Sequence, residues 1–372
     1  MVLWRRRVAS GGMRIVVFGA TGYTGRLVAE RLVASGARPV LAGRDDARLS
    51  ELASALGGLE TAHADAMRQN SIFDLVGSGD VLVSTVGPFV KWGMPAARAA
   101  IAAGATYLDS TGEPPFIRRV FEELDGPARR SGAALLTAMG YDFAPGSYAG
   151  ALALEDAGAR AARVDVGYYA LGATPASMSA GTRESLVGAT LSDGFAYRDG
   201  RIKTVRTAER VRSFAVSGKR RDGVSLGGAE HFALPAAYPG LSEVNVYLGW
   251  FGPLARPLQA GALVGEYVQR IPLARTTMRF WGEKAASLLS GPEAGTTPGG
   301  ASWIAAEAYD ESGAKLSEVH LRGEDPYAFS ASFLAWAAQQ QVSGSGALGP
   351  VQAYGLEALE RGMTLAGLTR IT

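Results

Sequence analysis

The sequence predicts an α/β protein, with a doubly wound parallel sheet in its first part and an α+β domain in its second. Over residues 13–160, short apolar runs alternate with segments of helical periodicity, which is typical of parallel strands joined by crossover helices. From Arg163 on, the run Val164-Asp165-Val166-Gly167 has the two-residue period of a sheet covered on one face. With 372 residues and 47% hydrophobic content, the chain is long enough for two domains.

The first predicted unit is a strand, a glycine turn and a helix. Residues 15–18 form an apolar run too short for a helix, and residues 24–35 follow with helical spacing as far as Gly36. A helix that begins on a glycine turn directs unpaired N–H groups and its positive dipole end toward an approaching anion. The unit therefore predicts a Rossmann-type dinucleotide site, with a plain tight turn as the alternative. The residues expected to bind the cofactor here are Gly19, Thr21, Gly22, Tyr23, Thr24 and Gly25.

The second predicted strand, residues 39–42, ends at Arg44. In this fold the residue at that point meets the adenosine ribose, where an acid accepts from a 2′-hydroxyl and an arginine neutralises a 2′-phosphate. Arg44 therefore favours NADP over NAD. The alternative is that Arg44 is a solvated surface residue and that Asp45 and Asp46 cap the next helix.

The third and fourth predicted strands add cofactor contacts. Asp65, after a strand at residues 59–64, lies either at the adenine edge or in the cap of the following turn. The fourth strand, residues 81–86, leads into Gly87 and Pro88, which let the backbone approach a flat ring and hold it stiffly. We therefore expect the nicotinamide beside Gly87 and Pro88, with Phe89 on the substrate side.

Two further strands, residues 106–109 and 133–137, complete the six predicted for this sheet, and the helix at residues 114–130 is expected to break at Gly126-Pro127. Ligands of a doubly wound sheet bind beyond the carboxyl ends of its strands. Groups at these ends that can act as a general acid are Tyr107, Asp109, Tyr141 and Asp142, and Glu113 is expected to contact the substrate. The alternative is that these side chains cap helices and brace loops.

The second domain is expected to contain short strands and interspersed helices. Asp199-Gly200 predicts a hairpin turn, with further strands at residues 211–216, 244–248 and 301–309. His231 follows Glu230 and is either a substrate contact or a structural histidine. Residues 179–190, 327–341 and 352–361 are expected to be helical, and residues 344–349 to form a flexible link before the last helix.

Composition excludes several kinds of site. The chain has no cysteine, which excludes disulfides, thiol nucleophiles and cysteine-ligated metals, and its three histidines lie far apart, so we expect no metal. The net charge of +2 comes with scattered basic residues, so we expect no nucleic-acid partner.

Two segments bear on localisation. Residues 1–12 are expected to be a disordered arm, or to precede a functional start at Met13, rather than to be a targeting signal. The apolar region 246–268 is interrupted by Pro253, Arg256 and Glu266, which argues against a membrane span and leaves a flap for an acyl chain or a bilayer surface, or a dimer or interdomain contact. We expect a cytoplasmic protein, with peripheral membrane contact and a homodimer as further expectations.

A short-chain dehydrogenase mechanism can be excluded, because it requires a lysine four residues after a tyrosine. The lysines are Lys91, Lys203, Lys219, Lys284 and Lys315, and none of them has that spacing.

The first part of the chain instead resembles the saccharopine dehydrogenase-like oxidoreductase family, which includes actinobacterial proteins described as trans-acting enoyl reductases. The matching segments are Gly19-Ala20-Thr21-Gly22-Tyr23-Thr24-Gly25, Ala42-Gly43-Arg44, Val86-Gly87-Pro88-Phe89, Tyr107-Leu108-Asp109-Ser110-Thr111-Gly112-Glu113 and Gly140-Tyr141-Asp142-Phe143-Ala144-Pro145-Gly146. A later segment, Ser177-Met178-Ser179-Ala180-Gly181-Thr182, resembles the start of that family's second domain. The resemblance implies an NADP-binding fold with an interrupted first domain, to which a C-terminal helix returns, and a hydride-transfer ancestry.

These observations lead to one expected function. The domains are expected at residues 13–160 for NADP binding, 161–325 for the substrate or dimerisation, and 326–372 for the helices that return. The first-domain crevice lacks the lysine and histidine groups expected for amino-acid substrates, which favours a less polar one. We expect an NADP(H)-dependent reductase of an enoyl or carbonyl group in a lipid-like, acyl or other small substrate. The alternative is a non-catalytic NADP-binding scaffold or redox-sensing partner.

Overall fold

The computed structural model describes residues 13–171, 194–249, 255–257, 259–260, 301–323 and 325–371. The expected arm at residues 1–12, the helix at 179–190, the segment at 177–182 and most of the apolar region 246–268 lie outside the described residues. Among the helices in the described ranges, none combines the length and the apolarity needed to cross a membrane.

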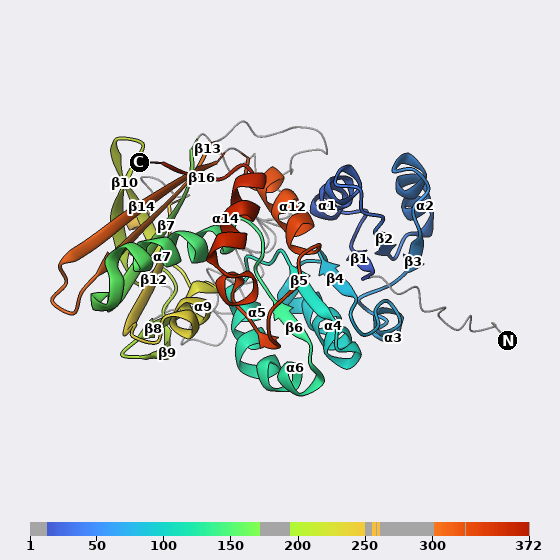
Figure 1. Ribbon diagram of the computed structural model, residues 1–372, viewed down its shortest axis with the longest axis horizontal. Helices are drawn as coiled ribbons and strands as arrows, with labels where there is room; N and C mark the ends of the chain where they lie inside the picture. Colours follow the sequence, from blue (N-terminus) through green and yellow to red (C-terminus); the bar gives the residue numbers. More distant parts are fainter. Residues whose placement is uncertain are drawn as a thin grey trace.

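Seven parallel strands form the first sheet, in the order β15-β6-β5-β4-β1-β2-β3 (Figure 1). They are β1 (Ile15–Phe18), β2 (Val40–Gly43), β3 (Thr61–His63), β4 (Val81–Ser84), β5 (Thr106–Asp109), β6 (Ala134–Leu136) and β15 (Gly346–Ala347). The chain order reverses between β1 and β4, and in such sheets the ligand crevice opens at this reversal, beyond the carboxyl ends. The predicted doubly wound parallel sheet is therefore confirmed.

Helices cover both faces of this sheet. They are α1 (Tyr23–Ala34), α2 (Asp46–Ala55), α3 (Asn70–Phe73), α4 (Phe89–Ala103), α5 (Pro114–Arg119) and α6 (Asp125–Ser131), with a π-helical turn at Val120–Leu124 between α5 and α6. The expected break at Gly126-Pro127 is wrong, because helical backbone continues through that point. Pro127 is the third residue of α6 and lies just after the π-helical turn, where the hydrogen-bond pattern of the helix is already irregular. The irregularity falls at the π-helical turn instead.

The seventh strand corrects a second expectation. Residues 344–349 are not a flexible link, because Gly346 and Ala347 pair in parallel with Ala134 and Leu135 of β6. The amide of Ala347 also donates to Asp125 Oδ1 at 2.9 Å. A Cβ at Gly346 would lie 2.5 Å from the same oxygen, so glycine lets this strand approach α6 closely.

The second sheet is mixed and has nine strands, with the main order β10-β11-β12-β7-β13-β14-β16 and with β8 and β9 added beside β12. The strands are β7 (Arg163–Leu171), β8 (Gly194–Arg198), β9 (Arg201–Val205), β10 (Val211–Val216), β11 (Lys219–Ser225), β12 (Glu243–Leu248), β13 (Ala301–Tyr309), β14 (Lys315–Gly323) and β16 (Thr369–Ile371). The predicted hairpin is confirmed: Arg198 pairs with Arg201, and Asp199 and Gly200 have φ of 52° and 70°, the left-handed values that a tight hairpin turn requires.

The further helices with bounds inside the described residues lie between or beside the two sheets. They are α7 (Ala144–Ala157), a 3₁₀ turn at Gly158–Arg160, α9 (Glu230–Ala237), α12 (Pro326–Ala337), α13 (Pro350–Tyr354) and α14 (Leu356–Leu365). Figure 1 shows α7 crossing toward the second sheet, and α7 packs on β7, β13 and β14. Helix α12 packs along α1, so the chain returns to the first domain as expected. The single helix expected at residues 352–361 is two helices, because Gly355, with φ of 74°, ends α13.

One apolar cluster runs from α1 and the first sheet through α7 into the second sheet. A second cluster fills the space between the first sheet and the side that carries α4 and α6. The two domains therefore share a core, with α7 at its centre.

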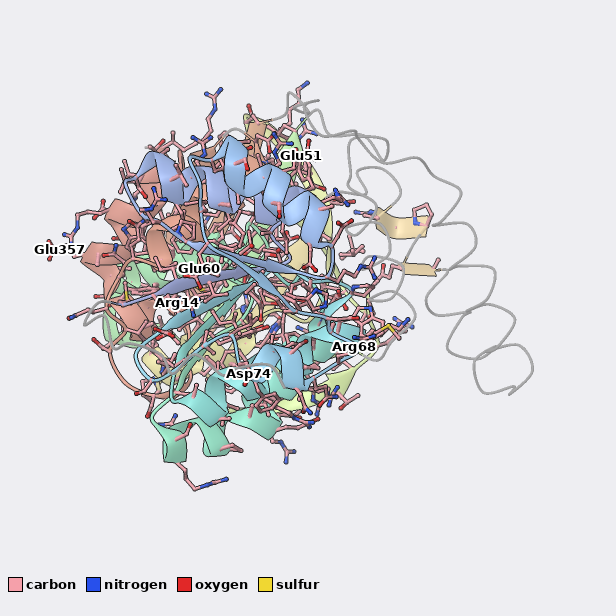
Figure 2. The ribbon with its side chains drawn as sticks, turned by 90° about the vertical axis from the view of Figure 1, so that its right-hand side faces the viewer. Arg14, Glu51, Glu60, Arg68, Asp74 and Glu357 are labelled. Carbon is pink, nitrogen blue, oxygen red and sulfur yellow. The ribbon has the colours of Figure 1, made fainter. Side chains whose placement is uncertain are left out.

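At the other end of the first sheet, Arg14 precedes β1 and forms an ion pair of 2.5 Å with Glu60, which precedes β3 (Figure 2). Glu60 is largely exposed, and an exposed pair of this kind contributes less than about 1 kcal/mol to stability. It lies opposite the carboxyl ends of the strands and serves below as a surface control.

Candidate active site

The glycines of the turn after β1 have no side chains that would keep neighbouring backbone away. Gly19 has φ of 91°, and a Cβ there would lie 2.8 Å from Thr85 Oγ1. A Cβ at Gly25 would lie 2.2 Å from the carbonyl oxygen of Gly19, so α1 packs directly on the turn. Gly22, the N-cap residue of α1, is exposed and has no side chain to accept from the first-turn N–H groups. These groups are therefore available to an anion such as a diphosphate.

The other predicted residues of this turn contact the neighbouring helices. The carbonyl oxygen of Thr21 accepts from Arg48 Nη2 at 3.1 Å, which ties the turn to α2. The ring of Tyr23 packs edge-on against Tyr327 of α12, with 5.2 Å between centroids. Tyr23 therefore packs against the returning helix and leaves Gly22 open, and Thr24 follows it in the first turn of α1.

Arg44 is exposed at the end of β2 and has no hydrogen-bond or ion-pair partner in the part of the chain that the structure describes. The two neighbouring acids have other partners. Asp45 accepts from the amide of Arg48 at 3.0 Å and caps α2, and Asp46 lies 3.0 Å from His63 Nδ1. The capping role that was the alternative for these acids is thus present, and it leaves the Arg44 guanidinium available. Its contact with a 2′-phosphate stays a prediction.

Asp65 takes the capping role rather than an evident ligand role. Its Oδ1 accepts from the amide of Met67 at 2.9 Å, and its own amide donates to Ser71 Oγ at 2.9 Å. These contacts close the turn before α3, and an adenine contact stays a prediction.

The predicted nicotinamide position lies where β4 meets α4. Gly87 is exposed, its peptide bond to Pro88 is cis, and a Cβ there would meet nothing closer than the Phe89 ring at 3.7 Å. Glu113 holds this point from the loop after β5, because its two carboxylate oxygens accept from the amides of Phe89 at 2.8 Å and Val90 at 2.9 Å. The structure thus gives Glu113 a capping role in place of the expected substrate contact.

Phe89 is also placed differently from the expectation. Its side chain is buried, with its ring 5.6 Å from that of Phe116, so it packs inside the domain. An aromatic residue in the first turn of an amphipathic helix such as α4 turns inward with the apolar face of the helix.

Among the four candidate acids, burial separates three from the fourth. Tyr107 and Asp109 are fully buried. Asp109 Oδ1 accepts from the amides of Thr111 and Ala138, each at 2.9 Å, which braces two loops, and burial raises its pKa to about 6. Tyr141 is buried too, and its hydroxyl donates to the carbonyl oxygen of Tyr169 at 3.3 Å.

Asp142 alone of the four keeps part of its surface exposed. It lies in the loop between β6 and α7, and a Cβ at Gly112, in the loop after β5, would lie 3.4 Å from its Oδ2. Its Oδ1 is covered and has no hydrogen-bond partner among the described residues. Burial raises the pKa of Asp142 to about 7, so the carboxyl can hold a proton near neutral pH. Its partial exposure and its raised pKa thus both make Asp142 the candidate proton donor.

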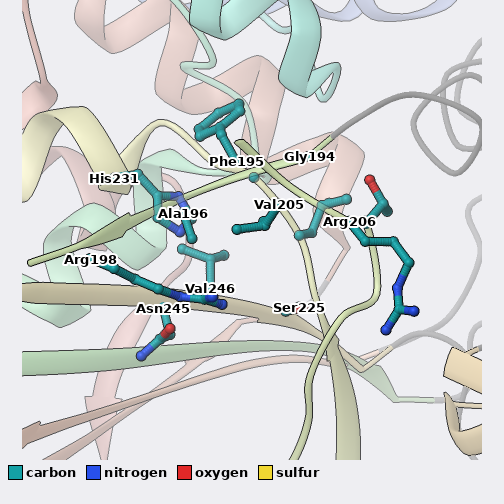
Figure 3. A pocket seen from close by; sticks show the side chains of 13 residues that line it. Gly194, Phe195, Ala196, Arg198, Val205, Arg206, Ser225, His231, Asn245 and Val246 are labelled. Carbon is teal, nitrogen blue, oxygen red and sulfur yellow. The ribbon is translucent and has the colours of Figure 1, made fainter. Parts of the chain in front are cut away.

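His231 lies in the second domain, at a small pocket between the β8–β9 hairpin and β12 (Figure 3). It is 2% exposed, and the amide of Gly228 donates to its Nδ1 at 3.0 Å. Burial lowers its pKa to about 4, so the ring is neutral at physiological pH. The pocket is lined by Phe195, Arg198 and Asn245 among others, and a substrate contact of His231 there stays a prediction.

Residues 15–136 match the family model of the saccharopine dehydrogenase NADP binding domain. This part of the chain is therefore similar to that domain family. The first domain is therefore an NADP-binding domain, which confirms the cofactor predicted from Arg44 and the glycine turn. The match covers the strands from β1 to β6.

Relatives are similar to part of this chain, and one solved structure shares its fold. The chain is 39% identical over 139 residues to a Mycobacterium tuberculosis protein provisionally named a trans-acting enoyl reductase, covering 35% of this chain and 33% of that protein. It is 36% identical over 137 residues to a trans-acting enoyl reductase of Mycobacterium leprae, again covering 33% of the relative. The similarity thus spans about a third of each relative's length. The fold resembles that of apo saccharopine dehydrogenase (L-Glu forming) from Saccharomyces cerevisiae, with a TM-score of 0.60, 12% identity, 97% of this chain covered and 100% of that chain.

Two residues beside the NADP-binding domain were not predicted as parts of the site. Tyr168 on β7 and Glu230 on α9 meet behind Asp142, where Tyr168 Oη lies 2.5 Å from Glu230 Oε1. In the sequence Tyr168 is one residue of an alternating strand and Glu230 one acid beside His231. The residues in the sequence that come closest to indicating this contact are Gly146 and Gly228, because a Cβ at either would lie 2.5 Å from a Glu230 carboxyl oxygen.

Proposed function

We propose that this protein is an NADPH-dependent reductase of an enoyl or carbonyl group in a lipid-like or other weakly polar substrate. One observation carries the proposal: a helix N-terminus without a side-chain cap, an arginine with no partner among the described residues and a partly exposed protonatable carboxyl, Asp142, all lie beyond the carboxyl ends of one parallel sheet. The first two suit the diphosphate and 2′-phosphate of NADPH, and the third suits proton transfer.

The residues present fit the cofactor. The turn from Gly19 to Gly25 would hold the diphosphate, Arg44 the 2′-phosphate, and Gly87 the nicotinamide ring, since Gly87 is exposed and has no side chain. When bound, NADPH supplies the hydride. Glu113 keeps the α4 N-terminus in place beside Gly87 and Pro88, because both its carboxylate oxygens accept from the helix.

The reduction needs one proton in addition to the hydride. The carboxyl of Asp142 would give this proton to the carbonyl oxygen, or to the carbon adjacent to the thioester of an enoyl substrate, and would become a carboxylate. A proton from solvent then restores the acid, because Asp142 is partly exposed. Hydride and proton together account for the two hydrogens that the substrate gains.

The substrate class rests on two supports. The mycobacterial relatives are named trans-acting enoyl reductases. The lysine that follows the predicted nicotinamide position in the sequence, Lys91, packs over Trp92, which argues against its pairing with an acidic substrate group.

The test is an NADPH-consumption screen over enoyl and keto thioesters of increasing chain length. We expect consumption with at least one thioester, little with NADH, and a loss of at least tenfold in kcat for Asp142→Asn. NADPH binding measured by fluorescence without consumption of any substrate would contradict the proposal and favour a non-catalytic NADP-binding scaffold.

A further inference from the structure

A buried carboxyl from the second domain lies behind the crevice. Glu230 is fully buried, and its Oε1 lies 2.5 Å from Tyr168 Oη. Its other oxygen, Oε2, has no hydrogen-bond partner among the described residues. No arginine, lysine or histidine ion pair involves Glu230 in the described part of the chain, although an ionised carboxylate at this depth would need one.

The hydrogen-bond count at Tyr168 decides where the proton lies. Its hydroxyl has one proton but two oxygens within reach, the carbonyl of Phe143 at 3.0 Å and Glu230 Oε1. Both contacts are satisfied only if Glu230 carries a proton and donates it to Tyr168 Oη, while Tyr168 donates to Phe143. The chain of donors then runs from Glu230 through Tyr168 to the residue next to Asp142.

Two glycines make room for this chain. A Cβ at Gly146, in the first turn of α7, would lie 1.9 Å from Tyr168 Oη, and a Cβ at Gly228 would lie 2.5 Å from Glu230 Oε2. Close packing on both sides holds the Tyr168 hydroxyl and the Glu230 carboxyl in one arrangement.

We propose that Glu230 is a positioning residue: as a neutral acid it donates to Tyr168, Tyr168 donates to Phe143, and this chain fixes Asp142 in the crevice. The inference rests on the proposed function in one respect, the role of Asp142 as proton donor. Loss of the Glu230 proton reverses the first hydrogen bond, so the single Tyr168 proton is shared between the carboxylate and Phe143. The loop that carries Asp142 then loses one of the hydrogen bonds that hold it.

The surroundings agree with a neutral Glu230. Burial raises its pKa to about 8 and outweighs the hydrogen bond that Tyr168 can donate to the ionised form, which lowers the pKa. Asp142 is the one other acid whose charge acts on it. His231 beside it is neutral, since burial lowers its pKa to about 4. The elements packed on α9 carry other titratable groups, but none of these has a resolved effect on Glu230; they include Glu155 on α7, Arg198 on β8, Glu243 on β12 and Tyr354 on α13.

The experiment follows protonated carboxyl groups in the full-length protein by infrared difference spectroscopy from about pH 5 to about pH 9, with no cofactor or substrate present. We expect two carboxyl signals to disappear above neutral pH in the unmodified protein. Glu230→Gln should remove the later signal and leave the remaining one, from Asp142, near neutral pH, because Glu230 is still uncharged when Asp142 ionises. A spectrum unchanged by Glu230→Gln would overturn the proposal, since Glu230 would then be ionised throughout.

Two further variants keep the test decisive. Glutamine can still donate to Tyr168 Oη, so Glu230→Gln should retain the melting temperature of the unmodified protein, whereas Glu230→Ala should lower it at every pH. If Glu230→Gln fails to fold, Asp142→Asn is measured instead. One carboxyl signal that disappears late in the titration of this variant would support the proposal, and the absence of any such signal would refute it. Because these measurements need no turnover, a negative reductase screen refutes the proposed function without affecting this result.

Discussion

Glu113 and Phe89 join two loops of the crevice, since the carboxylate of Glu113 accepts from the amide of Phe89 at 2.8 Å and closes the N-terminus of α4. The second oxygen accepts from Val90 at 2.9 Å, so no other cap is needed at this end of α4. A carboxylate at a helix N-terminus also interacts favourably with the helix dipole. The loop after β5 thereby fixes the position of Gly87 and Pro88.

The first prediction concerns this cap. Glu113→Ala leaves two amides at the start of α4 unpaired and should lower the free energy of unfolding by about 2 kcal/mol. Glu113→Gln keeps one acceptor oxygen and should cost about half as much. Urea unfolding measures both, with Glu60→Gln at the exposed ion pair as a control that changes stability by less than about 0.5 kcal/mol. Equal losses for the Glu113 and Glu60 variants would rule out the capping role.

The second prediction concerns cofactor choice. Arg44→Ala should weaken NADPH binding about tenfold to a hundredfold and leave NADH binding unchanged, because only NADPH carries the 2′-phosphate. Titration of NADPH and NADH fluorescence measures both affinities. Arg31→Ala, which removes an exposed arginine from the last turn of α1, is the matched control. If Arg44→Ala bound NADPH as tightly as the control does, the 2′-phosphate role would have to be abandoned.

The third prediction concerns the glycine turn. A methyl group at Gly25 would lie 2.2 Å from the carbonyl oxygen of Gly19, so Gly25→Ala must push α1 away from the turn. We expect NADPH affinity to fall at least about tenfold, or about 1.4 kcal/mol. Gly240→Ala is the control, because a Cβ there meets nothing within 4 Å. Unchanged NADPH affinity in Gly25→Ala would place the diphosphate elsewhere.

The fourth prediction concerns pH. Burial raises the folded-state pKa of Asp109 from 3.8 to about 6, so its contribution to stability is present below its unfolded pKa and is lost as the pH rises through about 6. Asp109→Asn cannot ionise, and the stability of the unmodified protein relative to this variant should fall between about pH 4 and about pH 7. Thermal unfolding across that range measures the difference. A difference that is flat or rises with pH would show that the Asp109 carboxylate is well stabilised in the fold.

The parts of the fold that follow from local pattern were predictable. The run Ile15–Phe18 is buried at every residue, and the turn after it has the positive φ at Gly19 that a glycine permits. The hairpin at Asp199-Gly200 likewise needs only its two turn residues. In each case neighbours in the sequence decide the backbone conformation.

Other features depend on partners far away in the chain and escaped prediction. Gly346-Ala347 becomes a strand only because β6 offers an edge to it, and two residues give no periodic signal. Phe89 and Glu113 were expected to face the substrate, yet their burial and capping depend on how α4 lies against the loop after β5. Tyr168 and Glu230 are 62 positions apart, and no local pattern brings them together.

The strands β15 and β16 have a consequence for biosynthesis. The nucleotide-binding sheet stays one strand short until residue 347 has emerged from the ribosome, and the neighbouring sheet stays incomplete until residue 371 has followed. The first sheet therefore gains its last strand only after β13 and β14 of the second sheet have been translated, so neither sheet is completed early on the nascent polypeptide.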